Sequence, residues 1–336
     1  MREALLYETL ERDRVRCHLC GHRCLIRPNE RGICGVRINQ GGRLFSEVYG
    51  LAVSANSDPI EKKPLFHFLP GTSSFSIATV GCNFTCKFCQ NHDISQMPKD
   101  QGRIIGHQLA PSEIVAQAIS RQDASISYTY TEPTIFFEYA LDTARAAAAA
   151  GLKNVFVTNG YMTEEALRTI GPDLHAANVD LKAFRDDFYK KLCQARLEPV
   201  KETIVRMKEA GVWVEVTTLI IPGHNDDEDE LTKLAEWLAG INPEIPWHIS
   251  RFHPTYQLLD TGPTPTALIH RAREIGLKAG LHYVYSGNVW GDEGEKTYCH
   301  KCHRLLIDRT GFSITANYLH EGSCPSCGTP MAGVGF

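Results

Sequence analysis

The chain has 336 residues, of which 43% are hydrophobic and 22% are charged, and its formal net charge is -4. This length allows a large core with one or two small modules, and the charge balance, with no basic run, gives no indication of nucleic-acid binding. No apolar stretch is long enough to cross a membrane, and the first residues lack the apolar core of a signal peptide. We therefore expect a cytoplasmic protein without a membrane partner.

Twelve cysteines are many for a chain without an export signal. Clustered cysteines in a reducing compartment are more often metal ligands than disulfide partners. Eleven of the twelve fall into three groups, while Cys193 stands alone and is expected to be an ordinary core residue. The groups predict three parts of the chain: a Cys-rich N-terminal module and lead-in over residues 1–70, a central domain over 71–290 and a tail over 291–336.

The first group offers four thiolates within a short stretch: Cys17, Cys20, Cys24 and Cys34. Gly21, Gly32 and Gly35 allow the chain to turn tightly around an ion, and His18 and His22 are alternative ligands. We expect zinc at this group, with a second iron–sulfur cluster or four metal-free thiols as the alternatives.

The second group has three members, not four: Cys82, Cys86 and Cys89. A short β-like run ends at Gly81, and the loop that follows presents the three cysteines with spacings of three and two residues. A [4Fe-4S] cluster held by three thiolates keeps one iron open to an exogenous ligand. An open position is what a catalytic metal centre needs and a structural one lacks. The loop therefore predicts a catalytic iron–sulfur cluster.

From residue 76 to about residue 285, apolar runs alternate with helical patterns. Such alternation predicts an α/β fold with a parallel sheet and helices outside it, and a partial (β/α)6-type TIM barrel is the simplest closure. The expected strands are Ser76–Val80, Ser125–Tyr130, Asn154–Val157, Ala177–Leu181, Trp213–Leu219, Trp247–Phe252 and His282–Tyr285. The expected helices are Pro111–Ser120, Thr134–Ala149, Thr163–Ile170, Pro199–Ala210, Asp227–Ala239 and Thr266–Ala279.

Polar residues follow these strands at their carboxyl ends, where barrels of this kind carry their chemistry. Each has an ordinary explanation as well: Asp180 caps a helix or pairs with Lys182, and Glu132 faces water. Their repetition at five strand ends favours a binding site. The candidates are Thr131, Glu132, Thr158, Asn159, Asp180, Lys182 and His253.

The tail carries two Cys-x-x-Cys pairs, Cys299 with Cys302 and Cys324 with Cys327. Each pair can place both thiolates on one tetrahedral metal, and the turn residues 308–311 between two apolar runs predict a hairpin between the pairs. We predict a zinc ribbon whose four thiolates leave no open position, with a rubredoxin-type iron site as the alternative.

The three-cysteine loop, with Phe88 directly before its last cysteine, resembles the signature of the radical S-adenosylmethionine (SAM) superfamily. The segments that follow resemble proteins of the pyruvate formate-lyase activating enzyme type. Over the whole chain, Cys17–Cys20, Gly32–Arg37 and Asp58–Phe68, together with the loop and the tail, look like the radical SAM proteins of the AmmeMemoRadiSam system. This resemblance implies a partial barrel that binds SAM across the ends of its strands.

The resemblance also implies roles for individual residues. Cys82, Cys86 and Cys89 would hold a [4Fe-4S] cluster, and Phe88, Thr131, Glu132, Thr158, Asn159, Asp180, Lys182 and His253 would bind SAM. Thr129–Glu132 stands where the family often has a Gly-Gly-Glu run, and the glycines are absent. Where activating enzymes carry an arginine on the fifth strand, this chain offers Glu215 or Thr217, which argues against a shared substrate.

The reaction implied is reductive cleavage of SAM to methionine and a 5′-deoxyadenosyl radical, which takes a hydrogen atom from a substrate. A one-electron reductant such as flavodoxin or ferredoxin would be a partner. The substrate stays open: a small molecule, peptide or RNA base, or a protein glycine if the chain is a glycyl-radical-enzyme activase. A non-catalytic metal-binding scaffold is a third hypothesis. The whole-chain resemblance favours an enzyme that acts on a small molecule, peptide or RNA base.

Overall fold

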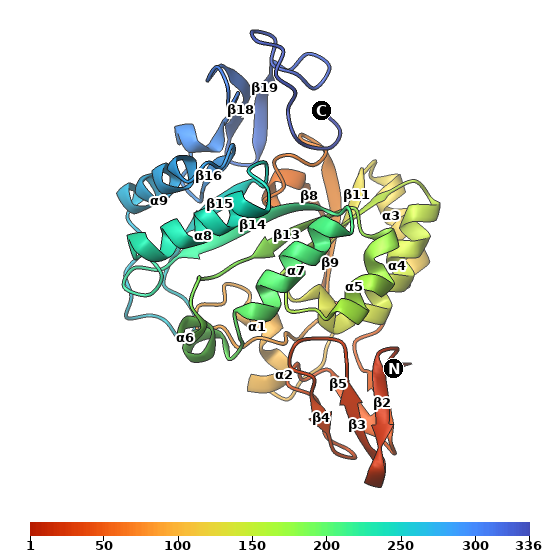
Figure 1. Ribbon diagram of the computed structural model, residues 1–336. Helices are drawn as coiled ribbons and strands as arrows, with labels where there is room; N and C mark the ends of the chain where they lie inside the picture. The colour runs from red at the N-terminus through yellow and green to blue at the C-terminus, as the bar shows by residue number, and fades with distance from the viewer.

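The computed structural model describes residues 1–336 and is built around one eight-stranded sheet, in the order β16-β15-β14-β13-β12-β11-β9-β8 (Figure 1). All strands except β8 run parallel to their neighbours. β16 and β8 lie at the two edges and do not pair, so the sheet is open, and the predicted α/β fold with a central parallel sheet is confirmed. The parallel strands are β9 (Ser73–Ala78), β11 (Ser125–Tyr128), β12 (Lys153–Thr158), β13 (Ala176–Asp180), β14 (Trp213–Ile220), β15 (Trp247–Arg251) and β16 (Val284–Gly287).

Helices connect the parallel strands and pack on the outside of the sheet (Figure 1). They begin where the sequence supplies a cap: the Thr163 side chain accepts a hydrogen bond from the backbone N–H of Ala166, and Asp227 accepts one from Glu230. The long helices are α3 (Pro111–Ser120), α4 (Phe137–Ala149), α5 (Glu164–Ile170), α7 (Glu198–Glu209), α8 (Glu228–Ile241) and α9 (Thr266–Lys278), and the short ones are α1 (His92–Ser95), α2 (Met97–Asp100) and α6 (Asp186–Phe188). No helix is both long enough and apolar enough to span a bilayer.

The edge strand β8 (Ser54–Pro59) was not expected from the sequence. It pairs antiparallel with β9, from Ser54 opposite Ala78 to Pro59 opposite Ser73. Its residues are mostly polar and include a proline, which is typical of an edge strand and gives no apolar signal. The lead-in therefore contributes directly to the central sheet, and its Ser54 end lies opposite Ala78, at the end of the strand that leads into the cluster loop.

The N-terminal module and the C-terminal tail lie at opposite ends of the molecule (Figure 1). The module holds two small antiparallel sheets, and the tail holds a third that includes the predicted hairpin. Their strands are β1 (Arg2–Glu3), β2 (Tyr7–Leu10), β3 (Arg14–Cys17), β4 (Leu25–Ile26), β5 (Arg37–Gln40), β6 (Arg43–Ser46), β17 (Thr297–Tyr298), β18 (Leu305–Thr310) and β19 (Ser313–Asn317); a short pair joins β7 (Leu51–Ala52) to β10 (His107–Gln108).

The tail is fixed to the barrel through His67, which is fully buried. Its Nδ1 lies 2.7 Å from the carbonyl oxygen of Ala332 and its Nε2 lies 2.5 Å from the hydroxyl of Tyr285. A neutral imidazole satisfies both contacts, with Nδ1–H donating and Nε2 accepting. Burial lowers the pKa of His67 to about 4.

We expect acidification to weaken the fold through this histidine. Between pH 6.5 and pH 4 the unfolded imidazole binds a proton and the folded one does not, so the free energy of unfolding falls as pH falls through that window. The loss amounts to about 3 kcal/mol, at 1.36 kcal/mol per pKa unit. Urea unfolding at pH 7 and pH 4 of the wild type and of His67→Gln measures it, and an equal pH dependence in the two proteins would contradict the prediction.

Candidate active site

A cavity of about 300 Å³ lies at the carboxyl ends of the central strands. The cluster loop that follows β9 forms one wall, and the ends of β11 to β15 form the others. Ten residues predicted from the sequence line it together: Cys82, Cys86, Phe88, Cys89, Thr131, Glu132, Thr158, Asn159, Asp180 and Lys182. His253 does not, because the chain leaves β15 with Phe252 buried and His253 exposed, so its predicted contact with SAM is not supported by its position.

The three loop cysteines are free thiols that meet hydrogen-bond donors from the surrounding protein. The backbone N–H of Phe84 lies 3.4 Å from the Cys82 sulfur, and the amide Nδ2 of Asn159 lies 3.8 Å from the same atom. The hydroxyl of Ser95 lies 3.2 Å from the Cys89 sulfur. Donors around sulfur stabilise thiolate charge, which is the form that binds iron. The donor set therefore fits three thiolate ligands of an iron–sulfur cluster.

The free thiols have raised pKa values. Burial raises the pKa of Cys82 well above its usual value and also raises that of Cys89. For Cys86 the first cause is a hydrogen bond with the Cys193 thiol, followed by burial. Iron binding would therefore release protons from these thiols, as metal binding to cysteine does in general.

Cys193 is a residue whose position the sequence did not reveal. It ends a π-helical turn, Tyr189–Cys193, and is fully buried behind Cys86. Its carbonyl oxygen accepts a hydrogen bond from the backbone N–H of Thr85, at 3.0 Å. Cys193 does not line the cavity. It supports the loop from behind, and three cysteines, not four, face the cavity.

Glu132 joins the ends of two neighbouring strands, β11 and β12. One carboxylate oxygen accepts hydrogen bonds from the backbone N–H and hydroxyl of Thr134 and from the hydroxyl of Thr158, at 3.0, 2.6 and 2.7 Å. The other accepts from the backbone N–H of Asn159 at 2.8 Å. Burial raises its pKa. Because a carboxylate offers about four acceptor positions, this side chain holds the rim of the cavity in place and has little capacity left for a ligand.

The turn at Tyr130 has a backbone conformation that favours glycine, although this chain has no glycine there. Its φ of 63° places the backbone in the left-handed region that glycine adopts without strain. The phenol hydroxyl donates to the carboxylate of Asp58, and the Nζ of Lys63 lies 2.8 Å from the same carboxylate oxygen. The pKa of Asp58 lies well below its usual value because hydrogen bonds from Lys62, Lys63 and Tyr130 outweigh the opposing effect of burial. A side-chain anchor therefore fixes the turn that glycine would otherwise permit.

This geometry predicts an unusual order of stability for two substitutions at Tyr130. Tyr130→Gly and Tyr130→Ala both remove the phenol, but only alanine keeps a Cβ in the left-handed backbone. We therefore expect the alanine variant to be less stable by about 1 kcal/mol. Urea unfolding of the two variants side by side measures the difference, and an alanine variant as stable as the glycine variant contradicts it.

Asp180 and Lys182 leave β13 toward the cavity as an ion pair, with 2.8 Å between Nζ and a carboxylate oxygen. The ammonium group also lies 5.8 Å from the centre of the Phe88 ring. The two side chains thus point to the same face, as their predicted role requires. Lining residues that the sequence analysis missed are Phe84, Gln90, Asn91, Ser95, Thr129, Tyr130, Val157, Leu219 and Ser250; Lys62 and Thr217, from segments that it had singled out, also line the cavity.

The two candidates on β14, Glu215 and Thr217, lie in different surroundings in the structure. Thr217 lines the cavity. Glu215 is fully buried, and its carboxylate accepts hydrogen bonds from the backbone N–H groups of Phe66 and His67, at 3.0 and 2.8 Å. It also lies 2.6 Å from the Nε2 of His248. Glu215 therefore holds the lead-in on the sheet, and of the two only Thr217 faces the cavity.

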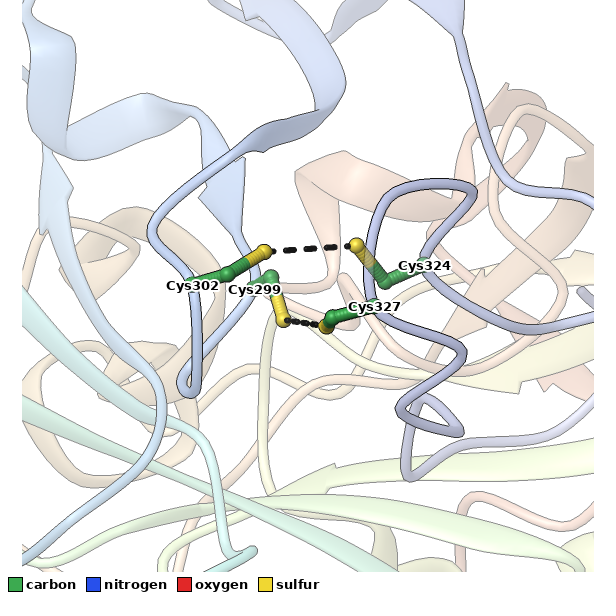
Figure 2. Close-up of side chains that lie close together, drawn as sticks. All are labelled: Cys299, Cys302, Cys324 and Cys327. Atoms are coloured by element: carbon green, nitrogen blue, oxygen red, sulfur yellow. Dashed lines mark hydrogen bonds between the residues drawn. The ribbon is translucent and has the colours of Figure 1, made fainter.

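The tail brings its four cysteines together (Figure 2). The sulfur atoms of Cys299 and Cys327 lie 3.6 Å apart, as do those of Cys302 and Cys324, and all four lie within 4.8 Å of one another. A hydrogen bond from the Thr329 hydroxyl lowers the pKa of Cys327 to about 6. This spacing suits one tetrahedral metal ion.

Comparisons with known proteins agree with this geometry. Residues 76–238 match the Radical SAM superfamily. The chain is 48% identical over 331 residues to an uncharacterized protein, MJ0808, of Methanocaldococcus jannaschii, with 98% of each chain covered. It is 21% identical over 224 residues to the pyruvate formate-lyase-activating enzyme of Listeria monocytogenes, covering 62% of this chain and 82% of that one. The solved structure of a radical SAM methyltransferase from Sphaerobacter thermophilus has the same fold, with a TM-score of 0.51 at 18% identity over 71% of each chain.

The chain belongs to the radical SAM superfamily, whose members are enzymes that use SAM and a [4Fe-4S] cluster. The predicted superfamily is thereby confirmed. The narrower likeness to the AmmeMemoRadiSam system stays a prediction.

Proposed function

We propose that this enzyme cleaves SAM reductively and uses the resulting radical to take a hydrogen atom from a substrate not yet identified. One observation carries the proposal: three thiols, without a fourth, face a cavity that is also lined by polar residues from the ends of several strands. Three thiolates leave an iron open for SAM, and the strand ends supply polar contacts around it.

The residues that line the cavity have three different roles in this proposal. Cys82, Cys86 and Cys89 hold the [4Fe-4S] cluster, and Glu132 positions the rim. Phe88, Thr131, Thr158, Asn159, Asp180 and Lys182 contact SAM in this proposal. When bound, the cluster supplies the electron that splits SAM into methionine and a 5′-deoxyadenosyl radical. The protein orients SAM and keeps water away from the reacting atoms.

Other parts of the proposal rest on chemistry rather than on the cavity. The electron requires a one-electron donor such as flavodoxin or ferredoxin. Twelve free cysteines suit a reducing compartment, which supports the cytoplasm as the location. The tail cysteines hold zinc in this proposal, because four thiolates at this spacing make a closed tetrahedral site.

A glycyl-radical activase is the second candidate, and the likeness to the Listeria enzyme supports it. In that case the hydrogen atom would come from a glycine of a protein partner. The cavity favours the broader proposal, because Thr217 stands where the family resemblance leads us to expect an arginine in activating enzymes.

The test is anaerobic reconstitution with iron and sulfide, followed by dithionite and SAM, with 5′-deoxyadenosine measured by chromatography. We expect product from the wild type and none from Cys82→Ala/Cys86→Ala/Cys89→Ala. Cys193→Ala is the matched control, because it removes a thiol beside the loop but outside the cavity, and it should keep both iron and product formation. A wild-type protein that holds a full cluster and forms no product would disprove the proposal.

A further inference from the structure

The four cysteines of the N-terminal module converge on a second, smaller cavity. Cys17 ends β3, and Cys20, Cys24 and Cys34 come from the loops that follow. All four are free thiols. The other lining side chains are mostly apolar and include Leu19, Ile26, Ile33 and Ile135. Four soft sulfur donors in an apolar enclosure form a site for a metal centre, not for an organic ligand.

Arg37 gives a second, independent indication that something binds there. Its side chain is 2% exposed and lines this cavity. Both Nη atoms are occupied by the carboxylate of Glu138, at 2.8 and 2.7 Å. The Nε is buried and has no hydrogen-bond partner. An unsatisfied buried donor on a charged group is costly, and an anionic sulfur-bound centre in the cavity would supply the missing acceptor.

The two nearby histidines are engaged elsewhere, so the ligands are the four sulfurs. The Nε2 of His22 lies 2.8 Å from the carbonyl oxygen of Asn83. The Nδ1 of His18 lies 2.9 Å from the Arg23 guanidinium, and its Nε2 lies 3.5 Å from the Glu8 carboxylate. A site with only sulfur ligands suits either zinc or an iron–sulfur cluster.

The distances between the sulfurs distinguish a zinc site from an iron–sulfur cluster. Zinc–sulfur bonds of about 2.3 Å in a tetrahedron place the sulfurs about 3.8 Å apart. The tail quartet has all four sulfurs within 4.8 Å of one another and is the one such group of ligand atoms in the chain. The N-terminal sulfurs are therefore more widely spaced, as are those of Cys82, Cys86 and Cys89. Sulfurs spaced more widely than a single zinc ion requires match a cluster of several irons.

We propose that Cys17, Cys20, Cys24 and Cys34 hold a second iron–sulfur cluster. Four protein ligands leave it no open iron, so it is not a second SAM site. It lies against the catalytic loop: the carbonyl oxygen of Cys34 is 3.1 Å from where a Cβ on Gly81 would stand, and His22 contacts the residue after Cys82. The proposal does not depend on SAM cleavage.

The experiment measures iron, acid-labile sulfide and zinc per chain in the full-length protein after anaerobic reconstitution. If both clusters are [4Fe-4S], the wild type should hold about eight irons, and Cys82→Ala/Cys86→Ala/Cys89→Ala should keep about four, with equal sulfide. After dithionite reduction, that triple variant should still give the electron paramagnetic resonance signal of a reduced cluster. Its iron can come only from the second site, so the result is independent of the proposed catalysis.

Two further variants complete the design. Cys20→Ala/Cys24→Ala should lose half of the wild-type iron, and Cys299→Ala/Cys302→Ala should lose zinc and keep all iron. A triple variant without iron but with two zinc ions per chain would show that the N-terminal site binds zinc. A triple variant with neither iron nor a second zinc would show four free thiols. Either result overturns the proposal, whether or not the N-terminal variant folds.

Discussion

Replacing Glu132 by glutamine should lower 5′-deoxyadenosine formation on the order of 10²-fold, because a misplacement of about 1 Å at a reacting centre has an effect of that size. The carboxylate receives four donors from Thr134, Thr158 and Asn159. A glutamine amide must turn its own N–H groups toward at least one of them. The free energy of unfolding should fall by about 2–3 kcal/mol for the same reason.

Thr158→Ser is the matched control for this prediction, because it keeps the hydroxyl that donates to Glu132 and should behave like the wild type. Thr158→Val removes one donor and should have an intermediate effect. Product formation is measured in the cleavage assay, and unfolding is followed in urea. Activity of Glu132→Gln within a factor of two of the wild type would show that the carboxylate does not position the rim.

Replacing Glu215 by alanine should destabilise the fold by more than about 4 kcal/mol, which is in the range for breaking a buried charged network. Its carboxylate is fully buried and accepts from two backbone N–H groups, from the indole of Trp213 at 3.0 Å and from His248. The pKa of Glu215 is lowered although burial acts to raise it, because the hydrogen bond and charge of His248 outweigh burial. Alanine leaves all four donors without an acceptor.

Glu215→Gln keeps one acceptor oxygen in place and should lose about half as much stability as the alanine variant. Urea unfolding of reconstituted protein, followed by circular dichroism, compares the two. If Glu215→Ala unfolds within 1 kcal/mol of the wild type, the lead-in is held to β14 by packing alone.

The sequence was sufficient for the central strands, because strands buried on both faces appear as apolar runs separated by capped helices. β8 escaped notice since an edge strand needs no apolar run. The role of Tyr130 was also missed, because it depends on a contact with Asp58 that spans 72 positions of the chain. Patterns over a few neighbouring residues cannot predict contacts between residues so far apart in the sequence.

For the candidate site, too, part was predictable from the sequence and part was not. The spacing of Cys82, Cys86 and Cys89 defines a motif within eight residues, so the sequence alone identified it. His253 was chosen for its place after a strand, but the direction of its side chain depends on how the chain turns after Arg251, and that turn exposes it. Position relative to a strand predicts proximity to the cavity, while orientation needs the tertiary structure.

The left-handed turn at Tyr130 has a consequence for finding related proteins. Here the backbone shape usually encoded by glycine is held by a pair of residues 72 positions apart: Tyr130, which follows β11, and Asp58, which lies in β8. A sequence pattern that requires glycines before the residue equivalent to Glu132 will not find chains that stabilise this turn with a tyrosine and an aspartate. A pattern that accepts either glycine or a tyrosine with an upstream aspartate would recover them, and covariation between the two positions is the signature to look for.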